Sequence, residues 1–350
     1  MTQVRHGGSP GRERDGTHGR KRGGKGGGKG GAEQVMVPDA DFTSYYGRPI
    51  VKPAPWEDDI AYYLFTGGVA AGSALLGAGA DLTGRPGLRR VARLGSLGGL
   101  GLSIGFLVHD LGKPSRFLNM LRVAKLTSPM SVGTWILSLH GPFAGLASAA
   151  EVVSMLPAPW QRVGPLRLVS FLGRPAGLVG ALTAPPVAAY TAVLLADTAT
   201  PAWHSAHEEL PFVFCGSAAA ASGGLGMLGS PVAEAGPARA FAVGGAVVEL
   251  VAERRMEQSM GLSAETLHQG TAGRWMRAAT GLTVAGAAGA LVGRRSRVVS
   301  MVSGAALMAG SLCTRMGVYK AGMASARDPK YTVVPQRERA DRGYRGKARP

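Results

Sequence analysis

A polar stretch at residues 109–135 separates two apolar segments of the chain. It contains ionisable, amide and hydroxyl side chains, among them His109, Asp110 and Asn119, and prolines interrupt it. Histidine takes up and releases a proton near neutral pH, and a neighbouring carboxylate can hold its tautomer or pass the proton on. At a membrane surface, such a stretch is suited to binding an amphipathic ligand.

The elements that position this stretch are apolar runs. Segments of about 20 residues, the length that crosses a hydrocarbon core of roughly 30 Å, recur along most of the chain. Charged residues make up only 17% of the sequence and gather at its ends and in short connectors. We therefore predict an all-α polytopic membrane bundle of about eight transmembrane helices. The expected spans are residues 60–80, 91–109, 133–155, 175–196, 209–228, 238–253, 275–293 and 298–316.

Small and helix-breaking residues inside these spans predict how the helices pack. Glycines four residues apart let helix backbones approach closely. Two adjacent prolines in the fourth span remove backbone donors and predict a kink or a local opening. The glycine pairs are Gly68 and Gly72, Gly101 and Gly105, and Gly289 and Gly293, and the prolines are Pro185 and Pro186.

The two ends of the chain depart from the apolar pattern and supply most of the net charge of +17. Residues 1–31 are mainly Gly, Arg and Lys, which bury too little apolar surface to become ordered. We expect a disordered basic tail at 1–55, a transmembrane domain at 56–320 and a polar basic tail at 321–350. The basic tail is suited to anionic headgroups; a nucleic-acid arm would need aromatic residues to stack on bases.

The amino-acid sequence of the polar stretch closely resembles that of the NrfD/polysulfide-reductase membrane subunits. Residues 110–114 read Asp-Leu-Gly-Lys-Pro, where that family has Asp-Leu-Gly-Arg-Pro. The resemblance extends over about residues 55–333 and leaves only the tails outside. Further matching segments are 116–120, 127–135, 62–65, 70–72, 190–195, 201–204, 209–212 and 315–331.

The resemblance implies an eight-helix subunit without haem in the plasma membrane, acting in respiration. It would anchor a four-cluster ferredoxin-like iron–sulfur subunit, connected to a molybdopterin-type catalytic subunit, and bind a quinone, with menaquinone expected, near the clusters. The sequence offers only Cys215 and Cys313. Because a [4Fe–4S] cluster requires four thiolates, we expect no cluster here and no catalysis by this chain alone.

Quinone reduction requires hydrogen-bond donors for the carbonyl groups and a proton route to water. The candidate donors combine phenol, imidazole and amide groups, and the candidate proton carriers are ionisable groups in or near spans, where such groups are commonly functional. The expected quinone-binding residues are Tyr62, Tyr63, His109, Asn119, Tyr190 and His204. The expected proton-path residues are Asp110, His140 and Glu249.

Several of these residues have a structural alternative. Asp110 could pair with Lys113 or Arg116 at a helix end, and His109 could be an ordinary interfacial histidine. His140 could bond to a neighbouring helix. Two histidines from adjacent spans could also ligate a haem, although the resembled family has none.

The cluster of histidines and glutamates at 204–209 and the single residue Glu249 also allow other interpretations. His204, His207, Glu208 and Glu209 could form a proton-collecting rim, a solvated loop or a metal site, but one short segment rarely supplies a whole zinc shell. Glu249 could pair with Arg254 and Arg255 rather than carry protons.

Two other functions remain open from the sequence. A secondary transporter would use a midplane site at the Pro185-Pro186 break and would show an internal repeat, which we do not find. A scaffold would only anchor its partners. Glycine-rich runs such as 223–226 lack the strand–turn–helix setting of a phosphate loop.

Overall fold

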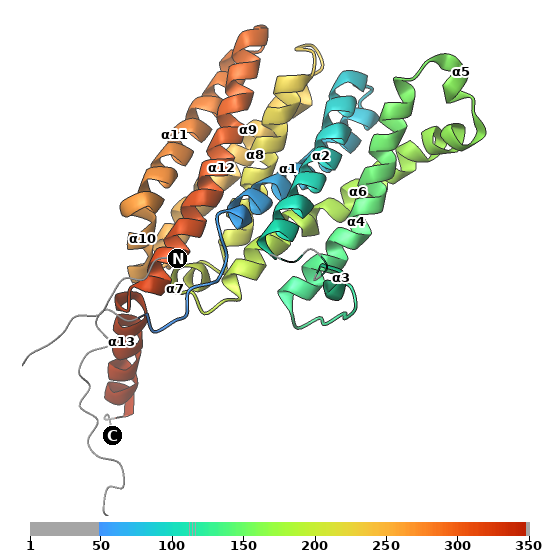
Figure 1. The fold of residues 1–350 in the computed structure, drawn as a ribbon. Coiled ribbons are helices and arrows are strands. Elements are labelled where there is room, and N and C mark those ends of the chain that lie inside the picture. Colours follow the sequence, from blue (N-terminus) through green and yellow to red (C-terminus); the bar gives the residue numbers. More distant parts are fainter. Residues whose placement is uncertain (1–48, 112, 114, 116, 348–350) are drawn as a thin grey trace, which may run out of the picture. The chain divides into compact units, whose positions relative to one another are not determined.

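The computed structural model describes residues 49–347 except 112, 114 and 116, and at 117, 118 and 342–347 it describes the backbone alone. Every regular element within those residues is helical (Figure 1). The long helices are α1 (Asp59–Leu82), α2 (Pro86–Asp110), α4 (Pro129–Ser154), α6 (Gly164–Ala196), α8 (Leu210–Gly229), α9 (Gly236–Ser259), α11 (Gly270–Val292) and α12 (Arg297–Arg327). The connecting elements are α3 (Phe117–Met120), α5 (Ala158–Gln161), α7 (Pro201–Ser205), η2 (Gly261–Ala264) and α10 (Glu265–His268), and α13 (Lys330–Lys347) follows α12.

The predicted membrane bundle is confirmed, and each of the eight expected spans corresponds to a long helix. Six of these helices, α1, α2, α4, α6, α8 and α12, are long and apolar enough to cross a membrane. The other two, α9 and α11, have 24 and 23 residues but are not among these six. In α9 the charged side chains of Glu249, Glu253, Arg254 and Arg255 lower its apolar content.

One expected boundary was wrong. Residues 157–174, before the fourth expected span, were expected to form a connector, but they contain α5 and the first turns of α6, which runs through Pro175, Pro185 and Pro186 as one helix. The basic residues in this range suggested a loop, but Arg174 is used in an ion pair with Asp81 of α1. The last expected span, 298–316, lies within α12, which continues to Arg327, and the domain bound at 320 stays a prediction.

Local signals explain where the helices begin. The hydroxyl of Ser128 accepts a hydrogen bond from the Ser131 backbone N–H at 3.5 Å, and Pro129 opens α4. Ser296 caps α12 in the same way through Val299. These are favoured residues at a helix start, because a hydroxyl satisfies a free backbone donor and proline has none to satisfy. Gly84, with φ of 66°, forms the tight turn between α1 and α2.

Small residues allow α8 to pack closely in the middle of the bundle. A Cβ on Gly216 would lie 2.5 Å from the Glu249 backbone nitrogen of α9, so no larger residue fits there. Gly72 of α1 and Gly289 of α11 are equally close to their neighbours, as expected. The prediction for Gly101 and Gly105 was wrong, because both face open space.

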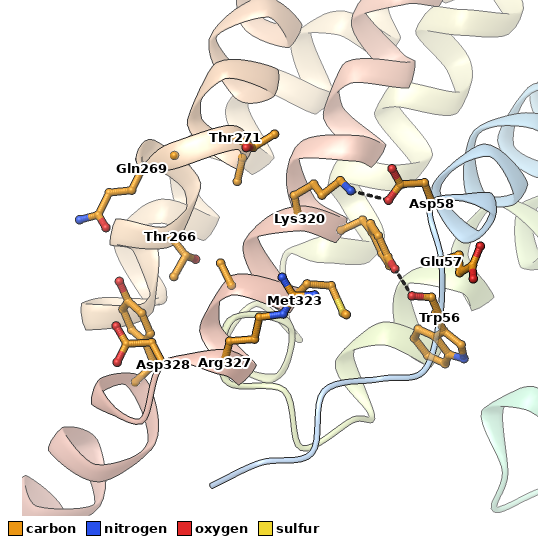
Figure 2. Close-up of a pocket in the computed structure, with 15 residues that line it drawn as sticks. Trp56, Glu57, Asp58, Thr266, Gln269, Thr271, Lys320, Met323, Arg327 and Asp328 are labelled. Carbon is orange, nitrogen blue, oxygen red and sulfur yellow. Dashed lines mark hydrogen bonds and ion pairs between the residues drawn. The ribbon is translucent and has the colours of Figure 1, made fainter. Parts of the chain in front are cut away.

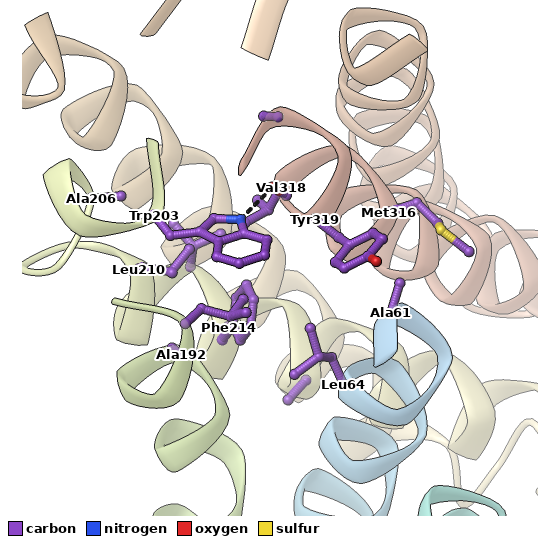
Figure 3. Packing of buried hydrophobic residues seen from close by; sticks show 14 of the residues in the cluster. Ala61, Leu64, Ala192, Trp203, Ala206, Leu210, Phe214, Met316, Val318 and Tyr319 are labelled. Atoms are coloured by element: carbon purple, nitrogen blue, oxygen red, sulfur yellow. Dashed lines mark hydrogen bonds between the residues drawn. The ribbon is translucent and has the colours of Figure 1, made fainter. Parts of the chain in front are cut away.

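Large aromatic side chains form the core where α7 meets α12. Figure 3 shows Trp203, Phe214, Tyr319 and Leu64 converging from α7, α8, α12 and α1. The Trp203 indole is fully buried, stacks on Tyr319 with ring centroids 6.0 Å apart, and donates to the Val318 carbonyl at 2.8 Å. This core fixes the short helix α7 against the end of α12.

Candidate functional site

Each candidate residue can be placed relative to the two ends of the helix bundle. We call one the α7 end; it comprises the start of α1, the end of α2, α3, the start of α4, the end of α6, α7 and the end of α12 (Figure 1). The other, the α5 end, comprises the α1–α2, α4–α6, α8–α9 and α11–α12 connections (Figure 1). All six expected quinone-binding residues lie at the α7 end.

Two of these residues contact each other directly. The hydroxyl groups of Tyr63 on α1 and Tyr190 on α6 share a hydrogen bond, and both side chains are buried. Gly133 on α4 makes room for them, since a Cβ at that position would overlap the Tyr190 ring. In a bond between two phenols one O–H donates and the other remains free. The pair therefore retains one donor for a ligand carbonyl.

Tyr62 and His109 lie on the outer side of this pair. The Tyr62 ring stacks on Phe106 of α2, with centroids 5.4 Å apart, and Phe106 precedes His109 by one turn. The His109 side chain is 79% exposed, and its Nδ1 lies 2.5 Å from a carboxylate oxygen of Asp59. Asp59 on α1, not Asp110, is thus placed to hold the imidazole in one orientation.

Asp110 is bound to the segment that precedes α1. Its carboxylate accepts a hydrogen bond from the Glu57 backbone N–H at 3.3 Å. Within the described residues no ion pair joins it to Lys113, and Arg116, the other expected partner, lies outside them. The carboxylate therefore ties residues 56–58 to the end of α2.

Asn119 and His204 stay apart from the tyrosine pair. Asn119 is exposed on α3. His204 is exposed on α7, where its Nδ1 lies 3.1 Å from the Ala196 carbonyl oxygen and its ring stacks on His207. Among the described residues, no group of three His, Cys, Asp or Glu side chains could hold a metal ion, so the cluster around His204 does not form one.

His140 and Glu249 lie deep inside the bundle. His140 is fully buried about 16 Å along α4 from Pro129, and its Nδ1 lies 3.0 Å from the Thr183 hydroxyl. Glu249 is buried on α9 and accepts from the Thr314 hydroxyl at 2.7 Å. The expected partners of Glu249, Arg254 and Arg255, are exposed instead.

A comparison of the sequence with models of protein families shows the family of this chain. Residues 50–229, just over half of the chain, match the model of the family polysulphide reductase, NrfD. The chain belongs to the NrfD family. Membership implies a multi-pass membrane subunit of respiratory oxidoreductase complexes, and such subunits are associated with quinone-reactive sites and typically pair with iron–sulfur and molybdopterin subunits. A comparison with curated proteins found no match.

All six expected quinone-binding residues of this NrfD subunit lie within the matched range, as do Asp110 and His140. Glu249 lies outside it. The matched range covers both ends of the bundle, so the comparison does not distinguish between them, and the role of each residue rests on the geometry given above.

A cavity of about 750 Å³ lies at the α7 end of the NrfD subunit, away from the tyrosine pair. Figure 2 shows residues 56–58 on one side, α12 in the middle and the start of α11 opposite. The Tyr319 hydroxyl donates to the Trp56 carbonyl at 2.5 Å, and Lys320 pairs with Asp58. These contacts hold the segment before α1 against α12.

Sequence reasoning missed a buried ionic network at the α5 end. Arg89 and Arg93 of α2 each contact both Asp81 of α1 and Glu151 of α4, and Arg174 of α6 also contacts Asp81. Glu151 is 2% exposed. The sequence feature that could have revealed Glu151 is a carboxylate inside an apolar span, the same feature that identified Glu249.

Proposed function

We propose that this NrfD subunit exchanges electrons between a partner iron–sulfur subunit and a quinone, expected to be menaquinone, bound at its α7 end. The observation that carries this proposal is the buried Tyr63–Tyr190 pair, which Gly133 accommodates within the family-matched range. The pair offers a hydrogen-bond donor in an apolar setting, where such a donor is strong. A quinone carbonyl is a suitable acceptor for it.

The nearby polar residues can complete the chemistry. A quinone, when bound, takes up two electrons and two protons. His109 is exposed to water and oriented by Asp59, so it can deliver protons taken from the medium. We assign Tyr62, Asn119 and His204, all exposed at the same end, to contacts with the ligand as it enters.

Proton movement through the bundle would require ionisable groups that lead from this end into its interior. We assign Asp110, His140 and Glu249 to such a path. His140 Nε2 and one Glu249 carboxylate oxygen are buried and have no partner among the described residues, so each could bond to an internal water.

Electron supply would come from partners. A four-cluster ferredoxin-like subunit would hold the clusters, and a molybdopterin-type subunit would carry out catalysis in the plasma membrane complex. The two cysteines of this chain are too few for a cluster. On this proposal residues 56–320 form the working domain, and the expected basic tail at 1–55 lies mostly outside the described residues.

The continuous course of α6 bears on the transporter alternative. That function would use unwound backbone at Pro185 and Pro186 to line a site. The structure has helix at both positions.

The test is quinone-dependent oxidation of the clusters in the purified native complex. We expect His109→Ala, Asn119→Ala and Tyr190→Phe to slow oxidation, by about tenfold to a hundredfold where a proton carrier is lost. Tyr319→Phe is the matched control, because it removes a phenol hydroxyl at the same end that bonds to Trp56 instead. Unchanged rates in all three variants would refute the site, and a wild-type complex that does not react with quinone would refute the function.

A further inference from the structure

A group of arginines at the α5 end has no role in the proposed function. Arg239 at the start of α9 lies close enough to Arg85, before α2, and to Arg294, between α11 and α12, for each of these two charges to act on it. Arg297, the first residue of α12, lies against the same α8–α9 connection. We call Arg85, Arg239, Arg294 and Arg297 the arginine group.

Carbonyl oxygens, rather than carboxylates, hold three members of the arginine group in place. Arg85 donates to the Ala233 carbonyl at 3.2 Å, and Arg239 donates to the Val232 carbonyl at 3.1 Å. Arg297 donates to the Ser230 carbonyl at 2.5 Å. These bonds gather the guanidinium groups around one turn without neutralising them.

The one carboxylate in residues 230–239 and 293–297 is already engaged. Glu234 accepts a hydrogen bond from the Leu88 backbone N–H at 3.0 Å and thereby caps α2. One nitrogen each of Arg85 and Arg239 is shielded from solvent without a partner among the described residues. Because the arginine group has four positive charges beside a single carboxylate, and like charges at short range repel each other, this arrangement favours an additional anion as counter-charge.

Apolar side chains beside the arginine group indicate where that anion comes from. Val292, at the end of α11, is 86% exposed, and Val298 and Val302 of α12 are exposed on the same hairpin. In a membrane protein such residues face acyl chains, and arginines next to them lie at the level of the headgroups. A ligand that meets both must carry an anionic head and an apolar tail.

We propose that the arginine group binds the phosphate of an anionic phospholipid, whose acyl chains lie along Val292 and Val298. This site is at the opposite end from the proposed quinone site and does not depend on it. A diester phosphate offers oxygen atoms that several guanidinium groups can share.

The experiment is native mass spectrometry of the full-length protein in detergent, with phosphatidylglycerol or phosphatidylcholine added at equal concentration. The main variant is Arg294→Gln. The Arg294 side chain is exposed and makes no hydrogen bond to the described residues, so its replacement breaks none. Arg162→Gln is the matched control, since Arg162 is exposed at the same end but outside the arginine group. A second variant, Arg239→Gln, keeps an amide donor toward Val232.

We expect the wild type to retain phosphatidylglycerol in preference to phosphatidylcholine, and each arginine variant to reduce this preference about fivefold. The control should behave as the wild type. Equal retention of both lipids by the wild type, or no change in either arginine variant, would overturn the proposal. Inorganic phosphate is the third arm: if it displaces phosphatidylglycerol at equal concentration, the group binds free phosphate and the lipid assignment is wrong.

Discussion

Charged side chains are arranged differently at the two ends of the bundle. At the α7 end the charged side chains form separate pairs, such as His109 with Asp59 and Lys320 with Asp58, with at least one exposed member in each. At the α5 end Asp81, Arg89, Arg93, Glu151 and Arg174 form one network that joins four helices. Glu151 and Arg93 in it are almost wholly buried.

This contrast indicates different roles for the two ends. Exposed pairs contribute little to stability and can exchange protons with water, which suits a site where a ligand is reduced. A buried network is costly to disrupt, because removing one member leaves its partner charged and without solvent. The α5 end therefore fixes α1, α2, α4 and α6 relative to one another, and the α7 end keeps the groups that can react.

The largest expected effect comes from breaking the network. Glu151→Ala leaves Arg93, whose side chain is 7% exposed, with its closest carboxylate removed. We expect a loss of about 3–5 kcal/mol in the free energy of unfolding. Chemical denaturation of the purified protein in detergent measures it.

Asp59→Asn is the variant for comparison at the α7 end, because it also removes a carboxylate that pairs with a basic side chain, here the exposed His109. We expect its unfolding midpoint to equal that of the wild type. If the two variants lose the same stability, the proposed difference between the ends is wrong.

A second, smaller effect is expected where α4 meets the tyrosine pair. A methyl group in Gly133→Ala would overlap the Tyr190 ring, which must then shift away from Tyr63. Overpacking of this kind costs about 1–3 kcal/mol. We also expect slower quinone-dependent oxidation of the clusters in the complex.

Gly141→Ala, on the same helix as Gly133, serves as the control for that substitution, since a Cβ there would lie an ordinary 3.7 Å from its nearest neighbour, Leu100 of α2. Equal rates for Gly133→Ala and the wild-type complex would show that the position of Tyr190 does not matter for the reaction.

The sequence predicted the membrane bundle and the family, because these depend on local patterns. Apolar runs indicate helices one at a time, and the motif at 109–135 is contiguous. The fourth span was expected to begin at 175 because the basic residues before it suggested a loop. The helix begins at Gly164 instead, and one of those basic residues, Arg174, pairs with Asp81. A residue whose partner is on another helix is invisible to such patterns.

The same limit applies to the candidate site. The motif led to His109 and Asp110, but the partner of His109 is Asp59, fifty residues earlier on α1. Likewise, Glu151 lay in an expected span and Arg93 in another, yet their pairing depends on how α2 packs against α4. Side-chain roles inside a bundle require the packing of the helices, which no single segment encodes.

A third prediction concerns the tyrosine pair itself. Tyr190→Phe removes one of the two hydroxyls and leaves Tyr63 buried without its partner. Hydrogen bonds between membrane helices contribute about 0.6 kcal/mol on average, so the loss of stability should be small. A large fall in the oxidation rate with this small fall in stability would separate a role in the reaction from a role in folding; a fall in stability alone would leave the pair structural.

The smallest expected effect is in a double-mutant cycle at the α7 end. Lys320→Ala, Asp58→Asn and the double variant report the coupling of that pair, whose side chains are 31% and 52% exposed. We expect a coupling energy below about 1 kcal/mol that decreases as salt is added, because solvent and ions screen exposed charges. The same cycle on Arg93 and Glu151 should give a larger coupling energy that salt changes little, since water and ions do not reach a buried pair. Two couplings of equal size and equal salt dependence would mean that burial does not distinguish the ends.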